Sequence, residues 1–324
     1  MRAIVVTEPG GPDVLRLEDV ETPVPDPEEI LIKVTAAGVN RADVLQRQGN
    51  YPPPPGASEI LGLEVSGSVA AVGAAVEGWQ AGDPCVALLA GGGYAEYAAV
   101  PAVQVVPPPK VDLVPAGGVL EVAATVDSNL ELAHLTSGEV FLVHGGAGGI
   151  GSFAIQYAKA RGATVISTAG DDDKIDYCRS LGADHALSYR EDWPVAVTHI
   201  TGGRGVDVIL DNMGAAYLER HLQVLAPNGR LMVIGLQGGT RANVDLSAML
   251  RRRGSITATS LRARPVEEKA SICRGVVERV WPLYRSGAIK PPRITSFPLA
   301  EAAAAHAQLE SGSNIGKIIL VAER

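Results

Sequence analysis

The sequence has little cysteine and no long apolar run. Its three cysteines, Cys85, Cys178 and Cys273, are odd in number and far apart, which excludes a disulfide framework and a local Cys-x-x-Cys metal or redox motif. A reducing, cytoplasmic setting is therefore expected. The chain opens on the strand-like run Ala3–Val6 without a signal segment, and no apolar stretch is long enough to span a bilayer. We therefore expect no membrane association.

Basic charge and aromatic residues are also scarce. There are 28 Lys and Arg against 36 Asp and Glu, a net charge of −8, and the only basic run is Arg251–Arg253. Such a chain lacks the electrostatic footprint of a nucleic-acid-binding protein, so no nucleic-acid partner is expected and the Arg run is interpreted as a solvated helix end. Aromatic residues make up 4% and hydrophobic residues 46%, which indicates a globular protein with an aliphatic core.

What the chain does have is length and two different patterns. Its 324 residues exceed what one hydrophobic core usually supports, so we expect two domains. The first hundred or so residues predict short strands separated by Pro and Gly turns. From about Val140, apolar strands alternate with helical stretches, which is typical of a doubly wound parallel sheet. The expected strands of that sheet include Val140–His144, Thr164–Thr168, Val206–Asp211 and Arg230–Gly235.

A glycine loop follows the first of these strands and precedes a helical stretch. Gly146, Gly148 and Gly151 have the Gly-x-Gly-x-x-Gly spacing, which allows a tight turn, close approach of the backbone to a pyrophosphate and close packing of the helix. A plain strand–helix connection would be the alternative, but the complete strand–loop–helix–strand unit favours a nicotinamide dinucleotide. The predicted phosphate-binding residues are Gly146, Ala147, Gly148, Gly149, Ile150 and Gly151.

The residues after the next strand give conflicting signals about the adenosine ribose. Ala169 and Gly170 are small, and Lys174 and Tyr189 could reach a 2′-phosphate, which would favour NADPH. Asp171 would instead favour a free 2′-hydroxyl, and thus NADH, or would act as the N-cap of the following helix. Both interpretations of Asp171 stay open from the sequence.

Several segments, in order along the whole chain, carry a family resemblance: Ala37–Tyr51, Pro53–Ser58, Leu61–Glu64, Leu210–Gly214, Gly235–Gly239, Thr259–Arg262 and Asn314–Lys317. With these segments the chain resembles the zinc-free quinone oxidoreductases of the medium-chain dehydrogenase/reductase superfamily, close to the branch that includes p53-induced quinone oxidoreductase. The resemblance implies a GroES-like β domain from residues 1–115 and 270–324, a Rossmann domain over residues 116–269, and an active cleft between them. It also implies NADPH as hydride donor, a quinone or similar electron-poor acceptor, and a homodimer.

The resemblance also assigns site residues. Asn40, Asp43 and Tyr51 match the catalytic end of the cleft, where Tyr51 would orient a carbonyl or supply a proton, or would simply pack against the proline loop. Further matches to cofactor contacts are Thr125, Asn212, Gly235, Leu236, Gln237, Asn314, Gly316 and Lys317, although Lys317 could equally be a surface charge. Leu63 stands where zinc-dependent relatives have a ligand His, so no zinc is expected.

Some positions depart from the family pattern. Gly148 and Asp171 replace serines, the chain is shorter between Gly117 and Glu121, and Asp127 replaces a frequent aromatic residue near the expected substrate cleft. The main function expected is reduction of quinones or activated alkenes by NAD(P)H. The alternatives are an enoyl-thioester reductase, with Tyr51 as proton donor, and a dinucleotide-binding protein with a structural or RNA-binding role.

Overall fold

The computed structural model describes residues 1–322. It divides into two compact units, one formed by Met1–Ala124 with Leu261–Arg324 and the other by Thr125–Ser260. We call the first the β unit and the second the Rossmann unit. No helix within residues 1–322 is both long and apolar enough to cross a membrane.

The β unit is built around a seven-stranded sheet with the order β14-β15-β3-β4-β5-β7, in which β6 also pairs with β3, and a separate pair β1-β2. In β3 (Glu29–Gly38) the alternate side chains Ile30, Ile32 and Val34 point into the core, as period-two alternation requires. The remaining strands are β1 (Arg2–Val6), β2 (Leu15–Asp19), β4 (Glu64–Val72), β5 (Pro84–Leu88), β6 (Tyr97–Pro101), β7 (Val105–Val106), β14 (Ile294–Pro298) and β15 (Lys317–Val321).

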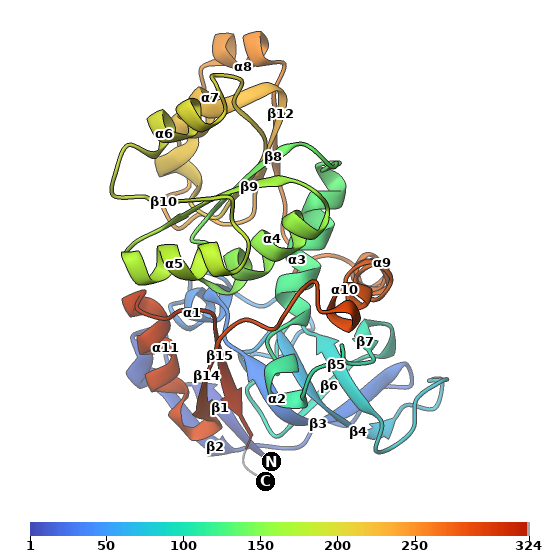
Figure 1. Ribbon diagram of the computed structural model, residues 1–324. Coiled ribbons are helices and arrows are strands. Elements are labelled where there is room, and N and C mark those ends of the chain that lie inside the picture. The colour runs from blue at the N-terminus through green and yellow to red at the C-terminus, as the bar shows by residue number, and fades with distance from the viewer. Residues whose placement is uncertain (323–324) are drawn as a thin grey trace. The chain divides into compact units, whose positions relative to one another are not determined.

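Both ends of the chain contribute to this sheet. β15 pairs antiparallel with β3, with Ile319 opposite Gly38, and β14 pairs with β15, so the red strands lie beside the blue strand β3 in Figure 1. The helices of the unit are α1 (Arg41–Arg47), α2 (Leu113–Ala116), α9 (Val266–Arg279), α10 (Trp281–Ser286) and α11 (Ala302–Ser311). The strand pairing therefore brings residues near position 317 close to those near position 38.

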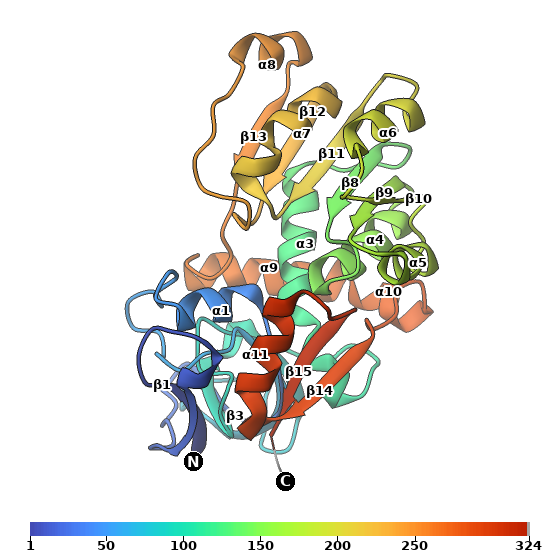
Figure 2. The same cartoon turned by 90° about the vertical axis from the view of Figure 1, so that its left-hand side faces the viewer.

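The Rossmann unit contains a six-stranded parallel sheet with the order β10-β9-β8-β11-β12-β13 (Figure 2). Its strands are β8 (Val140–His144), β9 (Thr164–Ala169), β10 (His185–Ser188), β11 (Val206–Asp211), β12 (Leu225–Val233) and β13 (Ser255–Ala258). Its helices are α4 (Gly149–Ala160), α5 (Asp172–Ser180), α6 (Trp193–Ile200), α7 (Leu218–Val224) and α8 (Leu246–Arg252), and α3 (Leu120–Leu132) leads into it. The predicted α/β fold class, with a doubly wound parallel sheet, is confirmed.

This strand order sets where a ligand can bind. From β8 the chain first adds β9 and β10 on one side and then crosses to add β11, β12 and β13 on the other. Because the crossovers are right-handed, α4 and α5 cover one face and α6 and α7 the opposite face. The connections after β8 and β11 thus diverge at the carboxyl edge of the sheet, and such a switch point is where open α/β sheets bind ligands.

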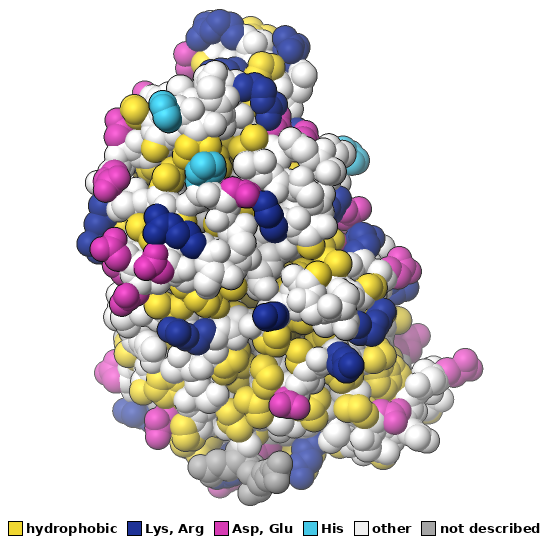
Figure 3. Space-filling model, in the orientation of Figure 1, with side chains coloured by type: hydrophobic (Ala, Val, Ile, Leu, Met, Phe, Trp, Pro, Cys, Tyr) yellow, Lys and Arg dark blue, Asp and Glu magenta, His cyan; other side chains and the backbone are white. Residues whose placement is uncertain are grey.

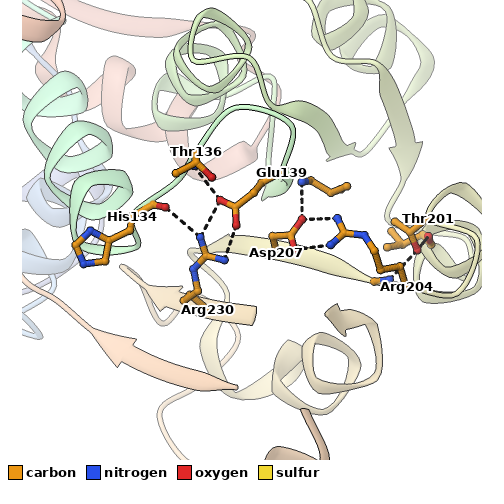
Figure 4. Close-up of polar contacts among 10 residues, drawn as sticks. His134, Thr136, Glu139, Thr201, Arg204, Asp207 and Arg230 are labelled. Atoms are coloured by element: carbon orange, nitrogen blue, oxygen red, sulfur yellow. Dashed lines mark hydrogen bonds and ion pairs between the residues drawn. The ribbon is translucent and has the colours of Figure 1, made fainter. Parts of the chain in front are cut away.

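The opposite, amino edge of the sheet is fixed by ion pairs (Figure 4). Arg230 donates to both carboxylate oxygens of Glu139 at 2.9 and 2.8 Å. Arg204 pairs with Asp207, which also accepts the N–H of Val140 at 2.8 Å. These bonds join β8, β11 and β12 at the end remote from the glycine loop, so they support the fold rather than the site.

The two units change at 124/125 and 260/261, whereas the family resemblance implies boundaries at 115/116 and 269/270. Both flanking segments pack on the β unit. Gly117 lies against the backbone of Ala36, and Nε of Arg262 donates to the carbonyl of Ala90 at 2.7 Å. Residues 116–124 and 261–269 therefore belong to the β unit.

Candidate functional site

The glycine loop occupies the switch point of the Rossmann unit. It connects β8 to α4, whose first residue is Gly149. A Cβ on Gly151 would lie 2.4 Å from the carbonyl oxygen of Gly145 and 2.5 Å from the Cα of Gly146, so only glycine permits this approach of helix and loop. Since the first N–H groups of a helix have no partner within it, the loop presents donors to an anion.

Gly148 differs from the other two glycines of the motif. Its φ is −83°, which any residue adopts, and a Cβ there would lie 3.4 Å from the carbonyl oxygen of Gly145, which is ordinary contact. The position therefore accepts a small side chain, which is compatible with the serine expected there in the resembling family. The anion cradle rests on Gly151 and Gly146, where a Cβ would lie 1.9 Å from the hydroxyl of Ser167.

Two further loops at the same sheet edge carry predicted contacts. Asn212 follows β11, and its backbone carbonyl accepts the N–H of Gln237 at 3.2 Å. Gly235 packs directly on Asn212, since a Cβ there would lie 2.9 Å from its carbonyl oxygen. The side-chain oxygen of Asn212 is buried and accepts no hydrogen bond within residues 1–322. A cradle that a Cβ would fill, together with this unsatisfied amide oxygen, fits a bound dinucleotide.

The residues predicted to contact the adenosine ribose lie together after β9 and β10. The N–H of Tyr189 donates to the carbonyl of Ala169 at 3.0 Å, and the hydroxyl of Tyr189 lies over Gly170, where a Cβ would meet it at 2.4 Å. Asp171 is the N-cap of α5 and accepts the N–H of Lys174 at 3.0 Å. The capping interpretation of Asp171 is therefore confirmed.

Asp171 also restrains Lys174 electrostatically. Its second carboxylate oxygen lies 3.1 Å from the Lys174 ammonium. The N–H and ammonium of Lys174, together with the charge of Arg190, hold the pKa of Asp171 below its usual value. The sequence does not predict a role for Arg190; the pairing of β10 with β9 brings it near Asp171.

In the β unit, Asn40 and Lys317 meet in a buried cluster. The Lys317 ammonium lies 2.7 Å from a carboxylate oxygen of Glu64 and donates to the side-chain oxygen of Asn40 at 2.5 Å. The amide of Asn40 donates to the same Glu64 oxygen at 3.1 Å. Lys317 is 3% exposed, so its interpretation as a surface charge is wrong. The aliphatic stem of Lys317 lies against Gly118, within the Gly117–Glu121 segment, where a Cβ would meet it.

Asp43 lies directly behind this cluster and is 0% exposed. One carboxylate oxygen accepts the N–H of Asn40 at 2.7 Å and the hydroxyl of Tyr94 at 3.1 Å, and the other accepts the N–H of Gly62 at 3.1 Å. Burial raises the pKa of Asp43 to about 6, although these donors and Lys317 oppose the shift. Both carboxylate oxygens of Asp43 accept hydrogen bonds from protein groups, so Asp43 holds Asn40 in place and does not face solvent.

Tyr51 is held by an arginine rather than by the proline loop alone. The Arg262 guanidinium lies 5.2 Å from the centre of the Tyr51 ring, donates to the Tyr51 carbonyl at 3.2 Å and to the side chain of Gln46 at 2.7 Å. Its Nε also donates to the carbonyl of Ala90 at 2.7 Å. No local sequence pattern predicts this role, because Arg262 lies more than 170 residues from each of these partners.

The remaining predicted residues have local roles in the structure. The Asn314 amide donates to the carbonyl of Gly316 at 3.3 Å, in the turn before β15. The carbonyl of Thr125 accepts from Asn129 at 2.8 Å. Asp127 is buried and accepts the hydroxyl of Tyr157 at 2.6 Å, so it fixes α3 to α4. Leu236 and Gln237 are exposed after β12.

The position expected to lack a zinc ligand is filled by a buried leucine, Leu63. Within residues 1–322, no group of three or more His, Cys, Asp or Glu side chains is placed to hold a metal ion. The three cysteines are all buried and free.

A β unit built from both chain ends and an inserted Rossmann-type unit define a class of two-unit α/β proteins. Two family models match the chain: "Alcohol dehydrogenase GroES-like domain" over residues 26–110 and "Zinc-binding dehydrogenase" over residues 149–273. The 2-haloacrylate reductase of a Burkholderia species is 31% identical over 98% of this chain and 98% of its own length. The quinone oxidoreductase of Rattus norvegicus is 32% identical over 99% of this chain and 98% of its own length.

A solved structure agrees with these relatives. The Escherichia coli quinone oxidoreductase complexed with NADPH has a TM-score of 0.88 and 31% identity, covering 99% of this chain and 100% of that chain. The chain therefore belongs to the medium-chain dehydrogenase/reductase superfamily, with a GroES-like unit and quinone-oxidoreductase-like homologues.

Proposed function

We propose that the protein is an NAD(P)H-dependent, zinc-independent oxidoreductase that reduces quinones or related activated alkenes. The observation that carries the proposal is the cradle of Gly146, Gly151 and Asn212 at the switch point of the sheet. The names of the two relatives support the acceptor classes, because a haloacrylate is an activated alkene. The segment Ala37–Tyr51 supports a place near the branch that includes p53-induced quinone oxidoreductase.

The reduced nicotinamide, when bound, supplies a hydride to the acceptor. The chain's contribution is then to bind and orient. The glycine loop would hold the diphosphate, and the amide oxygen of Asn212 would accept a hydrogen bond. Lys317 and Glu64 hold the side chain of Asn40 in one orientation, so Asn40 would help to position the acceptor. Tyr51, clamped by Arg262, is the candidate for orienting a carbonyl or donating the proton that balances the hydride.

We propose NADPH as the preferred donor, with NADH as the competing cofactor. Lys174, Arg190 and the Tyr189 hydroxyl supply the donors that a 2′-phosphate needs. Asp171 opposes this preference, because it already engages the Lys174 ammonium at 3.1 Å. The NADPH-bound E. coli relative supports the choice. Calorimetric titration with each dinucleotide tests it, and tighter binding of NADH would reverse the assignment.

Turnover is tested by following the oxidation of NADPH and NADH with a quinone panel, an enone panel and a crotonyl thioester. We expect acceptor-dependent oxidation with quinones or enones, reduced in Tyr51→Phe if Tyr51 donates the proton. Turnover of the thioester alone would assign an enoyl-thioester reductase. Dinucleotide binding without turnover of any acceptor would refute the reductase and favour a structural or RNA-binding role.

We further propose a homodimer formed through the Rossmann unit. Within residues 1–322, β13 pairs only with β12, which leaves its outer edge open, and an open edge favours pairing with another strand. Before the amino end of β13, Leu246 and Leu250 of α8 are 71% and 78% exposed, and basic side chains gather over this helix (Figure 3). A second copy fits because it offers the same edge and apolar residues. Light scattering should give twice the monomer mass, and a monomer for Leu250→Glu; a monomeric wild type would refute the proposal.

A further inference from the structure

A chain of buried polar side chains runs through the β unit behind Asn40. Arg47 of α1 lies 3.3 Å from Nδ1 of His306 on α11, and Nε2 of His306 lies 3.1 Å from the hydroxyl of Tyr94. The Tyr94 hydroxyl donates to Asp43 at 3.1 Å, and Asp43 accepts the N–H of Asn40 at 2.7 Å. Arg47, Asp43, Tyr94 and His306 are each 0% exposed.

The chemistry of these groups fixes the direction of every hydrogen bond. Arginine only donates, so Nδ1 of His306 must accept from Arg47. Neutral imidazole carries its proton on the other nitrogen, so Nε2 donates to the Tyr94 hydroxyl, which then has its own proton free for Asp43. The donors therefore run in one direction, from Arg47 through His306 and Tyr94 to the Asp43 carboxylate.

The neighbouring groups prevent the opposite direction of these hydrogen bonds. An ion pair with Glu310 at 2.8 Å holds the Arg47 guanidinium in place, and its charge faces the acceptor nitrogen of His306. Burial and the Arg47 charge lower the pKa of His306 to about 3, which keeps the ring neutral. The rings of His306 and Tyr94 meet edge to face at 5.7 Å between centroids. Rotation of the Tyr94 hydroxyl would break two bonds at once.

This series of hydrogen bonds leads through Asp43 to Asn40, the residue that the proposed reaction needs in a fixed position. Asp43 holds the backbone of Asn40, while Lys317 and Glu64 hold its side chain. Groups on α1, β4 and β15 thus hold both the backbone and the side chain of Asn40. His306 on α11 contributes to the backbone contact, because it acts through Tyr94 on Asp43.

We propose that His306 is a positioning residue of the reductase: its Nε2–H tautomer orients the Tyr94 hydroxyl toward Asp43 and so fixes Asn40 for the reaction. This inference rests on the proposed function for its kinetic consequence, although the tautomer and the order of Asn40 do not depend on it. The position requires one acceptor and one donor on a flat side chain, and the amide of Gln is the replacement that supplies both.

Three variants of α11 test the proposal. His306→Gln keeps the donor and acceptor, and His306→Leu removes both. Leu309→Ala is the control, because Leu309 packs on the same core without joining the chain. We expect kcat with the best acceptor to fall about 10- to 100-fold in His306→Leu, since displacement of a reacting geometry by about 1 Å costs this order. The KM for NADPH should change little, because the glycine loop is untouched. His306→Gln should recover most of kcat.

Two NMR measurements are independent of turnover. Nitrogen-15 spectra of the His306 ring, assigned by its loss in His306→Gln, should show the proton on Nε2 and no titration between about pH 5 and 8. The backbone N–H of Asn40, which donates to Asp43, should exchange with solvent faster in His306→Leu than in Leu309→Ala. A proton on Nδ1, a titrating ring, or equal kcat losses in His306→Leu and Leu309→Ala would overturn the proposal. If the wild type turns over no acceptor, the function fails, and the tautomer and Asn40 exchange still decide the positioning role.

Discussion

A methyl group at Gly151 tests the dinucleotide site by its steric demand. In Gly151→Ala the new Cβ would lie 2.5 Å from the Cα of Gly146, whereas carbon atoms prefer separations of about 3.5 Å or more, so the loop must retreat by about 1 Å. Overpacking of this kind costs about 1–3 kcal/mol in stability. Losing one charge-assisted hydrogen bond to the diphosphate costs about 1.5–3 kcal/mol, which weakens NADPH binding about 10- to 100-fold.

Gly148→Ala is the matched control, three residues away in the same loop. Its Cβ would meet only the Gly145 carbonyl, at 3.4 Å, so affinity and thermal stability should stay close to those of the wild type. Calorimetric titration with NADPH and thermal unfolding of the three proteins measure the difference. Wild-type affinity in Gly151→Ala would refute the assignment of the loop as the diphosphate cradle, and an equal loss in Gly148→Ala would refute the steric difference between the two positions.

Three further predictions concern buried or paired charges. Asp171→Ser keeps an N-cap but releases the Lys174 ammonium from its ion pair. Calorimetry should then show NADPH binding about 2- to 5-fold tighter, as expected for one exposed ion pair, and unchanged affinity for NADH. No gain in NADPH affinity would mean that Asp171 acts only as a helix cap. Lys317→Met leaves Glu64 buried and unpaired, which should cost about 3–5 kcal/mol in denaturant unfolding, and adding Glu64→Gln should recover part of it; a single variant as stable as the wild type contradicts this. Because burial raises the pKa of Asp43 from 3.8 to about 6, the folded state binds that proton more tightly, so its stabilising contribution is present below about pH 4 and declines by about 3 kcal/mol toward pH 6. The difference in unfolding free energy between the wild type and Asp43→Asn should therefore change by about 3 kcal/mol from pH 4 to pH 6; a difference that stays constant would contradict it.

Local sequence patterns located several elements well. β8 and β11 begin and end at the predicted residues, because continuous apolar runs predict buried parallel strands. β12 begins at Leu225 rather than at Arg230. Pro227, Asn228 and Gly229 read as a turn, yet the strand continues through an irregularity in its register with β11. Here pairing with a neighbouring strand overrode local turn preference.

The same distinction applies to the site. The spacing of Gly146, Gly148 and Gly151 indicated the anion-binding loop, because strand, loop and helix are adjacent in sequence. The partners of Arg262 and His306 could not be predicted in this way. Their hydrogen bonds join residues 172 and 212 positions apart, and no local pattern encodes such pairs.

The doubly wound sheet and the glycine loop follow from periodicity and spacing over short stretches, and the leucine at position 63 follows from residue identity. By contrast, the burial of Lys317 beside Asn40 and Glu64, rather than at the surface, is visible only in the folded molecule. That outcome depends on the register of β15 against β3 and of β3 against β4. Register is set by the packing of the whole sheet, which places a lysine 277 residues along the chain within hydrogen-bonding distance of Asn40.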